Sequence, residues 1–182
     1  TKTPFIMIIS GIRRSGKSTL LHQIRSNTLT ESYYVNFDDE RFVQFTVDDF
    51  QMLYEVLVEL FDTKNKFFFD EIQNIKGWER FIRRLHDERK KIYLTGSNAS
   101  MLSKELGTHL TGRHISFSLY PFSFKEFLQF KQHSYTNIQR LTTEQKSILK
   151  KLFNEYLEKG GFPEYLQTDK EEYLKTLYEN IL

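Results

Sequence analysis

The chain passes from a short apolar run directly into a loop bounded by two glycines, and this junction constrains the fold more than any other feature. Residues 5–10 have the composition of a buried strand, and residues 11–18 fit the pattern G-x-x-x-x-G-K-[ST] at every fixed position. A helical pattern follows at once. Gly11 and Gly16 allow positive φ and a close approach of the backbone to a ligand. The N–H groups of such a loop and the next helix form a concave anion site.

The loop residues predict what the anion is. Lys17 has the reach to contact the β- and γ-phosphates of a nucleotide, and the Ser18 hydroxyl is placed to bind Mg²⁺. The residues expected around the phosphates are Gly11, Arg13, Arg14, Ser15, Gly16, Lys17, Ser18 and Thr19. A glycine turn that matches by chance is the alternative, but it does not require a strand before the loop and a helix after it. The guanine-reading pattern [NT]-K-x-D does not occur in the sequence, so we expect ATP.

A second signal is the run Phe67-Phe68-Phe69 followed by Asp70 and Glu71. Three successive aromatic residues are typical of a strand buried on both faces. An aspartate at the end of such a strand holds Mg²⁺ in nucleotide hydrolases, so Asp70 and Ser18 are the predicted metal ligands. The neighbouring Glu71 can accept a proton from an attacking water and is the candidate general base. The alternative is an acidic strand end that caps the next helix.

Two further segments carry polar groups that could act on a γ-phosphate. The apolar run 92–95 ends in Gly96-Ser97-Asn98, and Asn98 is the best candidate there, with Thr95 and Ser97 behind it. An ordinary Gly-Ser-Asn turn is the simpler interpretation of that segment alone. Arg113 follows a Thr-Gly turn, and it is a candidate cation for the charge that develops on the γ-phosphate, in its own site or in a neighbouring subunit.

Apolar periodicity alternates between strand and helix, which predicts an α/β fold with a parallel sheet. The expected strands are 5–9, 33–37, 67–69, 92–95 and 114–119. The expected helices are centred on 20–24, 50–61, 78–85, 124–127 and 148–157, with a last one from about Lys170. The segment Gly160-Gly161-Phe162-Pro163 should end the long helix. We expect a core of residues 1–120 and a helical, lid-like segment of residues 121–182 that continues into a further C-terminal domain.

The amino-acid composition further limits the classes of protein to which this chain can belong. The net charge of +2 is too small to indicate nucleic acid by itself. The absence of cysteine excludes disulfides and thiolate metal sites and suits a reducing compartment, so we expect a cytoplasmic protein. The apolar run at residues 5–9 is too short to span a bilayer, and we expect no membrane association.

Taken together, these motifs resemble those of prokaryotic AAA+-type ATPases, close to the archaeal ATPase and STAND group of P-loop proteins. The matching stretches are residues 11–21, 69–74 with Trp78-Glu79, 94–98, 110–113, 119–127 and 160–164. The resemblance implies a three-layer P-loop fold with a five-stranded parallel sheet of order 5-1-4-3-2 and a small helical segment over the nucleotide. It also implies that Asn98 is the first sensor and Arg113 the arginine finger, and a homo-oligomer is possible.

The predicted function is Mg²⁺-dependent ATP binding and hydrolysis that drives a conformational switch or motor. A small P-loop kinase would share the fold and the first motif, but it usually lacks an Asp-Glu pair followed by a Thr-Gly-Ser-Asn strand end. A nucleic-acid translocase is suggested by Asp70-Glu71-Ile72-Gln73, yet a helicase core needs a second domain of the same kind. The sequence does not identify the partner, a protein or a nucleic acid, because one kind of ATPase domain serves many different cellular functions.

Overall fold

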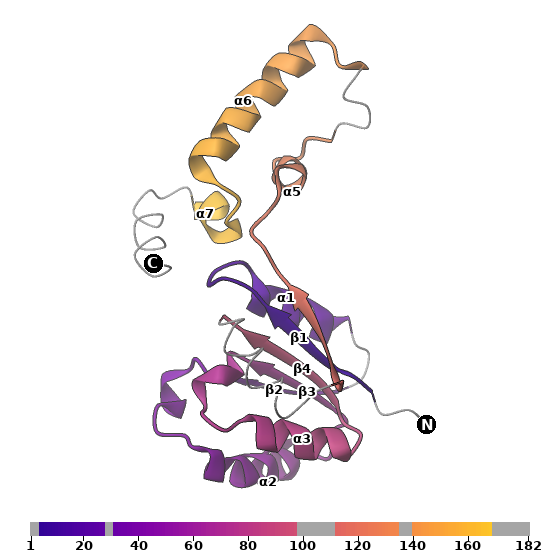
Figure 1. Cartoon of the computed structure of the whole chain (residues 1–182), viewed down its shortest axis with the longest axis vertical. Helices are drawn as coiled ribbons and strands as arrows, with labels where there is room; N and C mark the ends of the chain where they lie inside the picture. The colour runs from indigo at the N-terminus through magenta and orange to yellow at the C-terminus, as the bar shows by residue number, and fades with distance from the viewer. Residues whose placement is uncertain (1–3, 28–30, 98–111, 135–139, 169–182) are drawn as a thin grey trace. The chain divides into compact units, whose positions relative to one another are not determined.

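The computed structural model describes residues 4–27, 31–97, 112–134 and 140–168 (Figure 1). The chain forms two compact units. The first consists of residues 1–12 and 17–119, and the second of residues 13–16 and 120–182. Among the described residues, none of the helices is both long enough and apolar enough to cross a membrane.

The first unit is built on a five-stranded parallel sheet. Its strands are β1 (Ile6–Ser10), β2 (Tyr33–Asn36), β3 (Lys66–Asp70), β4 (Lys91–Gly96) and β5 (His114–Ser118). They lie in the order β2-β3-β4-β1-β5, which is 5-1-4-3-2 read from the other edge, and all neighbours are parallel. The predicted fold and strand order are therefore confirmed. In such a sheet the loops that follow the central strands meet at one edge, where ligands bind.

Helices cover both faces of this sheet, which gives three layers. Helix α1 (Lys17–Ser26) packs on one face through Leu21, while α2 (Phe50–Phe61) and α3 (Glu79–Asp87) lie on the other (Figure 1). The side chains of β3 show why both faces need cover. Phe68 packs on the α1 side and Phe67 and Phe69 on the α2–α3 side, and none of the three is exposed. Each buried ring contributes roughly 2 kcal/mol to folding.

The larger core lies between the sheet and helices α2 and α3. Helix α3 buries Phe81, Ile82 and Leu85, while its arginines are exposed. Phe81 stacks on Phe50 of α2 with ring centroids 4.5 Å apart. Three short 3-10 helices connect these elements: η1 (Glu40–Phe42), η2 (Val47–Asp49) and η3 (Ile72–Asn74). The many aromatic residues of the first unit are thus chiefly packing residues.

The second unit contains the helices α5 (Phe124–Phe130), α6 (Thr143–Lys159) and α7 (Pro163–Thr168). Ser123 and Glu126 form a capping box at the start of α5. Helix α6 ends at Lys159 and is followed by its C-cap residue Gly160, which has φ +70°. The next residue, Gly161, packs so closely against the backbone of Phe122 that a Cβ there would overlap the Phe122 carbonyl oxygen.

The second unit contains one helix that the sequence did not predict. The segment 160–163 ends α6 as expected, but Pro163 also begins the short helix α7, because the first helical position tolerates a residue without an N–H. The apolar side chains of α6 are only partly buried: Leu152 packs against α5, but Ile148, Phe153 and Leu157 are exposed. The helix expected from about Lys170 lies outside the described residues.

Candidate active site

The loop between β1 and α1 contains two residues with a left-handed backbone. Gly16 has φ +95°, and Arg14 is also left-handed with φ +67°. The Ser15 side chain is buried, and its Oγ has no hydrogen-bond partner among the described residues. Ser18 and Thr19 follow in the first turn of α1, and both are exposed. The predicted phosphate-binding residues therefore form one continuous segment that begins at the end of a central strand, although Arg13–Gly16 group with the second unit.

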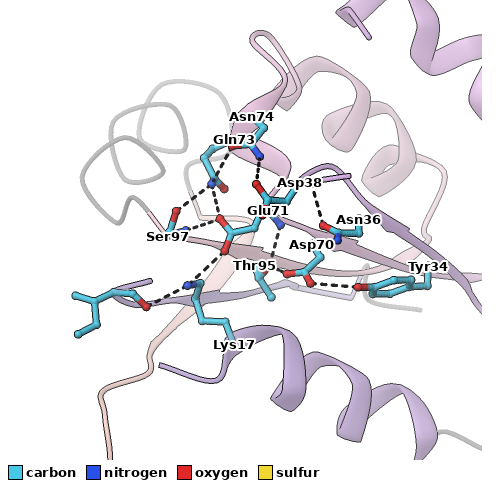
Figure 2. A network of polar contacts seen from close by, with 11 residues as sticks. Lys17, Tyr34, Asn36, Asp38, Asp70, Glu71, Gln73, Asn74, Thr95 and Ser97 are labelled. Carbon is cyan, nitrogen blue, oxygen red and sulfur yellow. Dashed lines mark hydrogen bonds and ion pairs between the residues drawn. The ribbon is translucent and has the colours of Figure 1, made fainter. Parts of the chain in front are cut away.

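Lys17 is the best-defined residue of this segment. Its side chain is only 4% exposed, and Nζ donates a hydrogen bond to the carbonyl oxygen of Ile12 at 3.1 Å. Nζ also lies 3.3 Å from Oε1 of Glu71, so the two side chains form an ion pair (Figure 2). An ammonium group that is nearly excluded from water requires such a partner. The ion pair joins the loop after β1 to the end of β3.

Glu71 is held on its other side as well. Its Oε2 accepts hydrogen bonds from Nε2 of Gln73 at 2.6 Å and from the backbone N–H of Ser97 at 3.0 Å (Figure 2). The residue has a left-handed backbone, with φ +49° and ψ +44°. Burial alone would raise the pKa of this carboxyl, but the Gln73 hydrogen bond, the Lys17 charge and the Ser97 contacts together lower it below its ordinary value.

Asp70 precedes Glu71 and is almost fully buried, with 2% exposure. One carboxylate oxygen accepts a hydrogen bond from the Tyr34 hydroxyl of β2 at 3.1 Å, and the other accepts one from the Thr95 hydroxyl of β4. The Thr95 hydroxyl in turn accepts a hydrogen bond from the Glu71 backbone N–H at 3.0 Å. Burial and the charge of Asp70 raise the pKa of the Tyr34 hydroxyl, so Tyr34 is a hydrogen-bond donor at neutral pH.

These groups suit Mg²⁺ by their chemistry. Mg²⁺ prefers oxygen ligands and is usually held by one or two carboxylates together with substrate phosphates and water. The described residues contain no group of three or more His, Cys, Asp or Glu side chains that could hold a metal by themselves. The Asp70 carboxylate and the Ser18 hydroxyl supply oxygen atoms of the kind that Mg²⁺ prefers.

Gln73 and Asn74, on η3, tie the end of β3 to its neighbours. Besides Glu71, Nε2 of Gln73 contacts the Ser97 hydroxyl at 3.3 Å, while its Oε1 is buried without a partner among the described residues. The Asn74 amide donates to the Phe37 carbonyl oxygen at 3.2 Å. It also donates to Asp38 at 3.3 Å (Figure 2). The site is therefore built from the ends of β2, β3 and β4.

The structure brings only some of the predicted residues together. Lys17, Asp70 and Glu71 lie in one network with Thr95 and Ser97, but Asn98 lies outside the described residues.

Arg113 lies at the other end of the parallel strands from the phosphate-binding loop. It precedes β5, and its carbonyl oxygen accepts the N–H of Ile6 at the start of β1, while the phosphate-binding loop follows the end of β1. The length of β1, about 15 Å, separates these two ends of the sheet. The guanidinium pairs with Asp87 at 2.9 Å.

The sequence does not predict the roles of Gln73 and Tyr34. It places Gln73 in the Asp-Glu-Ile-Gln run and Tyr34 in a strand. The signal for Gln73 was its position two residues after the candidate base. Tyr34 carried no comparable signal, because its role depends on the pairing of β2 with β3.

A parallel sheet of this order, with a glycine-lysine loop after β1 and an acidic pair after β3, defines a P-loop nucleotide-binding protein. The family model described as "AAA domain" matches residues 3–128. The chain therefore belongs to the AAA domain family.

Related proteins share the sequence over nearly its whole length. An uncharacterized protein of Methanocaldococcus jannaschii is 39% identical over 97% of this chain and 40% of its own length. An uncharacterized protein of Haemophilus influenzae is 37% identical over 99% of this chain and 46% of its own length. The chain thus spans less than half the length of these relatives.

Solved structures of low sequence identity are also similar. The Thermotoga maritima RuvB Holliday junction branch migration motor matches with a TM-score of 0.48 and 20% identity, over 70% of this chain and 42% of that one. Caenorhabditis elegans PCH-2 matches with a TM-score of 0.44 and 15% identity, over 82% of this chain and 49% of that one.

Proposed function

We propose that this chain is a Mg²⁺-dependent ATPase whose hydrolysis cycle switches the conformation of the parts attached to it. The observation that carries the proposal is the ion pair between Lys17 and Glu71, with 3.3 Å between Nζ and Oε1. It brings the predicted phosphate-binding lysine and the predicted general base into contact, although 54 positions separate them in the sequence (71 − 17).

The order of events follows from the charges. The β- and γ-phosphates of ATP carry more negative charge than one carboxylate, so they compete with Glu71 for the Lys17 ammonium. Once Lys17 turns toward the phosphates, Oε1 of Glu71 can accept a proton from water. That water attacks the γ-phosphorus, the bond to the β-phosphate oxygen breaks, and ADP leaves with its negative charge near Lys17. When bound, Mg²⁺ supplies charge neutralisation at the phosphates, and Ser18 and Asp70 are the residues that would hold it.

The remaining predicted residues have proposed roles in the same scheme. Gly11, Arg13, Arg14, Ser15, Gly16 and Thr19 would surround the phosphates, and Asn98 would contact the γ-phosphate. The position of Arg113 before β5, where it pairs with Asp87, favours a role outside the site of its own chain. We propose that it acts on the nucleotide of a neighbouring copy, which makes a homo-oligomer the active form.

We propose further that residues 1–120 are the catalytic core and residues 121–182 a helical lid. The matched region covers less than half of the relatives' length, and we propose that the parts moved by hydrolysis lie outside it. Those further parts determine whether the ATPase acts on a protein or on a nucleic acid.

The test measures ADP and free phosphate released from ATP by the parent protein and by Lys17→Ala. We expect equal amounts of both products from the parent, and neither binding nor turnover from Lys17→Ala, because the variant lacks the charge that contacts the phosphates. Lys76→Ala removes an exposed lysine of the same unit and is the matched control. ADP without free phosphate would indicate transfer to another acceptor, as in a kinase. Undiminished turnover by Lys17→Ala would show that the loop is not the nucleotide site.

A further inference from the structure

Tyr34 connects the two parts of the site that the proposed function assigns to Mg²⁺. Its hydroxyl donates to Oδ2 of Asp70 at 3.1 Å (Figure 2). In the parallel pairing of β2 with β3, Tyr34 lies opposite Phe68 and Asn36 opposite Asp70. Residues two apart on a strand share a face, so Tyr34 and Asp70 project to the same side of the sheet. This is the side on which Phe68 meets α1.

The Tyr34 ring is fixed from the other direction by α1. The His22 ring lies 4.5 Å from it between centroids, and the Arg25 guanidinium lies 5.4 Å from the Tyr34 centroid. Helix α1 begins with Lys17 and Ser18, and Ser18 is the second proposed Mg²⁺ ligand. One side chain therefore contacts both the helix that carries the hydroxyl ligand and the carboxylate ligand itself.

The Asp70 carboxylate is held from both neighbouring strands. Thr95 of β4 donates to one oxygen and Tyr34 of β2 donates to the other. Each carboxylate oxygen has a second lone pair available, so both hydrogen bonds can persist while the carboxylate accepts from water or faces a cation. A buried carboxylate with two fixed donors is restricted to one orientation before any ligand arrives.

We propose that Tyr34 is a positioning residue for the Mg²⁺ site: it orients the Asp70 carboxylate and keeps it in register with the start of α1. The inference rests on the proposed function. Residues that hydrogen-bond a metal ligand typically change metal affinity by about 10–100-fold when they are removed. The competing explanation is that the hydroxyl only satisfies a buried carboxylate and contributes to stability.

The variant Tyr34→Phe separates these explanations, because it keeps the ring against His22 and Arg25 and removes only the donor. Tyr33→Phe is the matched control. Tyr33 is also on β2, and its hydroxyl donates to the Asp62 carbonyl oxygen and accepts from the Lys64 N–H, remote from Asp70. The readout is the Mg²⁺ concentration that half-saturates binding of a fluorescent, non-hydrolysable ATP analogue, with nucleotide binding in EDTA measured alongside.

We expect Tyr34→Phe to raise the half-saturating Mg²⁺ concentration by about tenfold or more and to leave binding in EDTA unchanged. Tyr33→Phe should match the parent in both. In an Asp70→Asn background, Tyr34→Phe should cause no further shift, since the two residues act through one carboxylate.

A Mg²⁺ midpoint within about twofold of the parent for Tyr34→Phe, or an equal shift for Tyr33→Phe, would overturn this inference alone, since either result falls outside the expected range. A parent protein without Mg²⁺-dependent nucleotide binding would overturn the proposed function and this inference with it.

Discussion

The side chains of Lys17 and Glu71 neutralise each other across the site, with 3.3 Å between Nζ and Oε1. Lys17, which is proposed to bind phosphate, and Glu71, which is proposed to accept a proton, are thus paired with each other. In the proposed cycle, ATP displaces the Glu71 carboxylate before it binds Lys17, so Glu71 becomes available as a base only when a nucleotide is present.

This arrangement predicts an unequal effect of Glu71→Gln on binding and chemistry. Hydrolysis should slow by about two orders of magnitude or more, because the general base is lost. Affinity for ATP should be equal to that of the parent or several-fold higher, because Lys17 no longer has a charged competitor. Equilibrium binding and single-turnover hydrolysis measure the two quantities, with the exposed Glu59 changed to Gln as the control. Joint loss of binding and hydrolysis would indicate a structural role for Glu71.

Gln73 should matter for catalysis more than for binding. Its amide donates to Glu71 at 2.6 Å and to the Ser97 hydroxyl at 3.3 Å, so it fixes where the carboxylate lies. In Gln73→Leu we expect kcat to fall by about tenfold to a hundredfold while the Kd for ATP stays near that of the parent. Steady-state kinetics and equilibrium binding test this, and the exposed Gln51→Leu serves as the control. A change in Kd with kcat intact would mean that Gln73 shapes the nucleotide pocket instead.

The proposed role of Arg113 predicts that two inactive variants complement each other. If it acts on a neighbouring copy, Arg113→Ala should bind ATP normally but lose turnover. Mixing it with Glu71→Gln should restore part of the activity, because some interfaces then join an intact Glu71 to an intact Arg113. Turnover per chain should also rise with protein concentration. Failure of the mixture to recover, together with concentration-independent turnover, would exclude action between subunits.

The second unit offers a pH-dependent test of stability. Glu155 accepts a hydrogen bond from Lys131 at 2.9 Å and lies 3.6 Å from Lys159. The Lys131 hydrogen bond and the charges of both lysines lower the pKa of Glu155, against a smaller opposing effect of burial. Because the pKa is lowered in the folded protein, the stabilisation is complete above the ordinary glutamate value and disappears as pH falls through the lowered one.

The variant Glu155→Gln should therefore reduce the free energy of unfolding at neutral pH, by about 1 kcal/mol or less since the pair is partly solvated. Below the lowered pKa the variant and the parent should be equally stable. Urea unfolding followed by circular dichroism at the two pH values measures this, and Glu158→Gln, an exposed residue on the same helix, is the control. An effect of equal size at both pH values would show that packing, and not the ion pair, is responsible.

Local patterns were sufficient to predict much of this structure. The strand at Phe67–Phe69, the charged outer face of α3 and the capping box at Ser123 each follow from residues close in sequence. The contact between Lys17 and Glu71 does not follow from a local pattern. Strand β4 lies between β1 and β3, and the two side chains meet because the loops after parallel strands gather at one end of the sheet.

Features that depend on packing could not be predicted in this way. Tyr34 reaches Asp70 only through the register of β2 with β3, and a strand sequence does not specify its register. The exposure of Ile148 and Leu157 likewise depends on which face of α6 meets α5, and not on helical periodicity. The position of Pro163 was ambiguous for a different reason, since proline both ends one helix and begins the next.

The left-handed backbone of Glu71 limits how this position can change over evolution. Aspartate and asparagine adopt such a conformation more readily than glutamate does, so a shorter side chain would relax the chain locally. Aspartate would keep the carboxylate but is one methylene shorter, which withdraws the oxygens from Lys17, Gln73 and the Ser97 N–H. Glutamate at position 71 thus has an unfavourable backbone conformation, but its longer side chain contacts all three of these partners. A lineage that lost the need for catalysis should drift first at this residue, toward aspartate, asparagine or glycine.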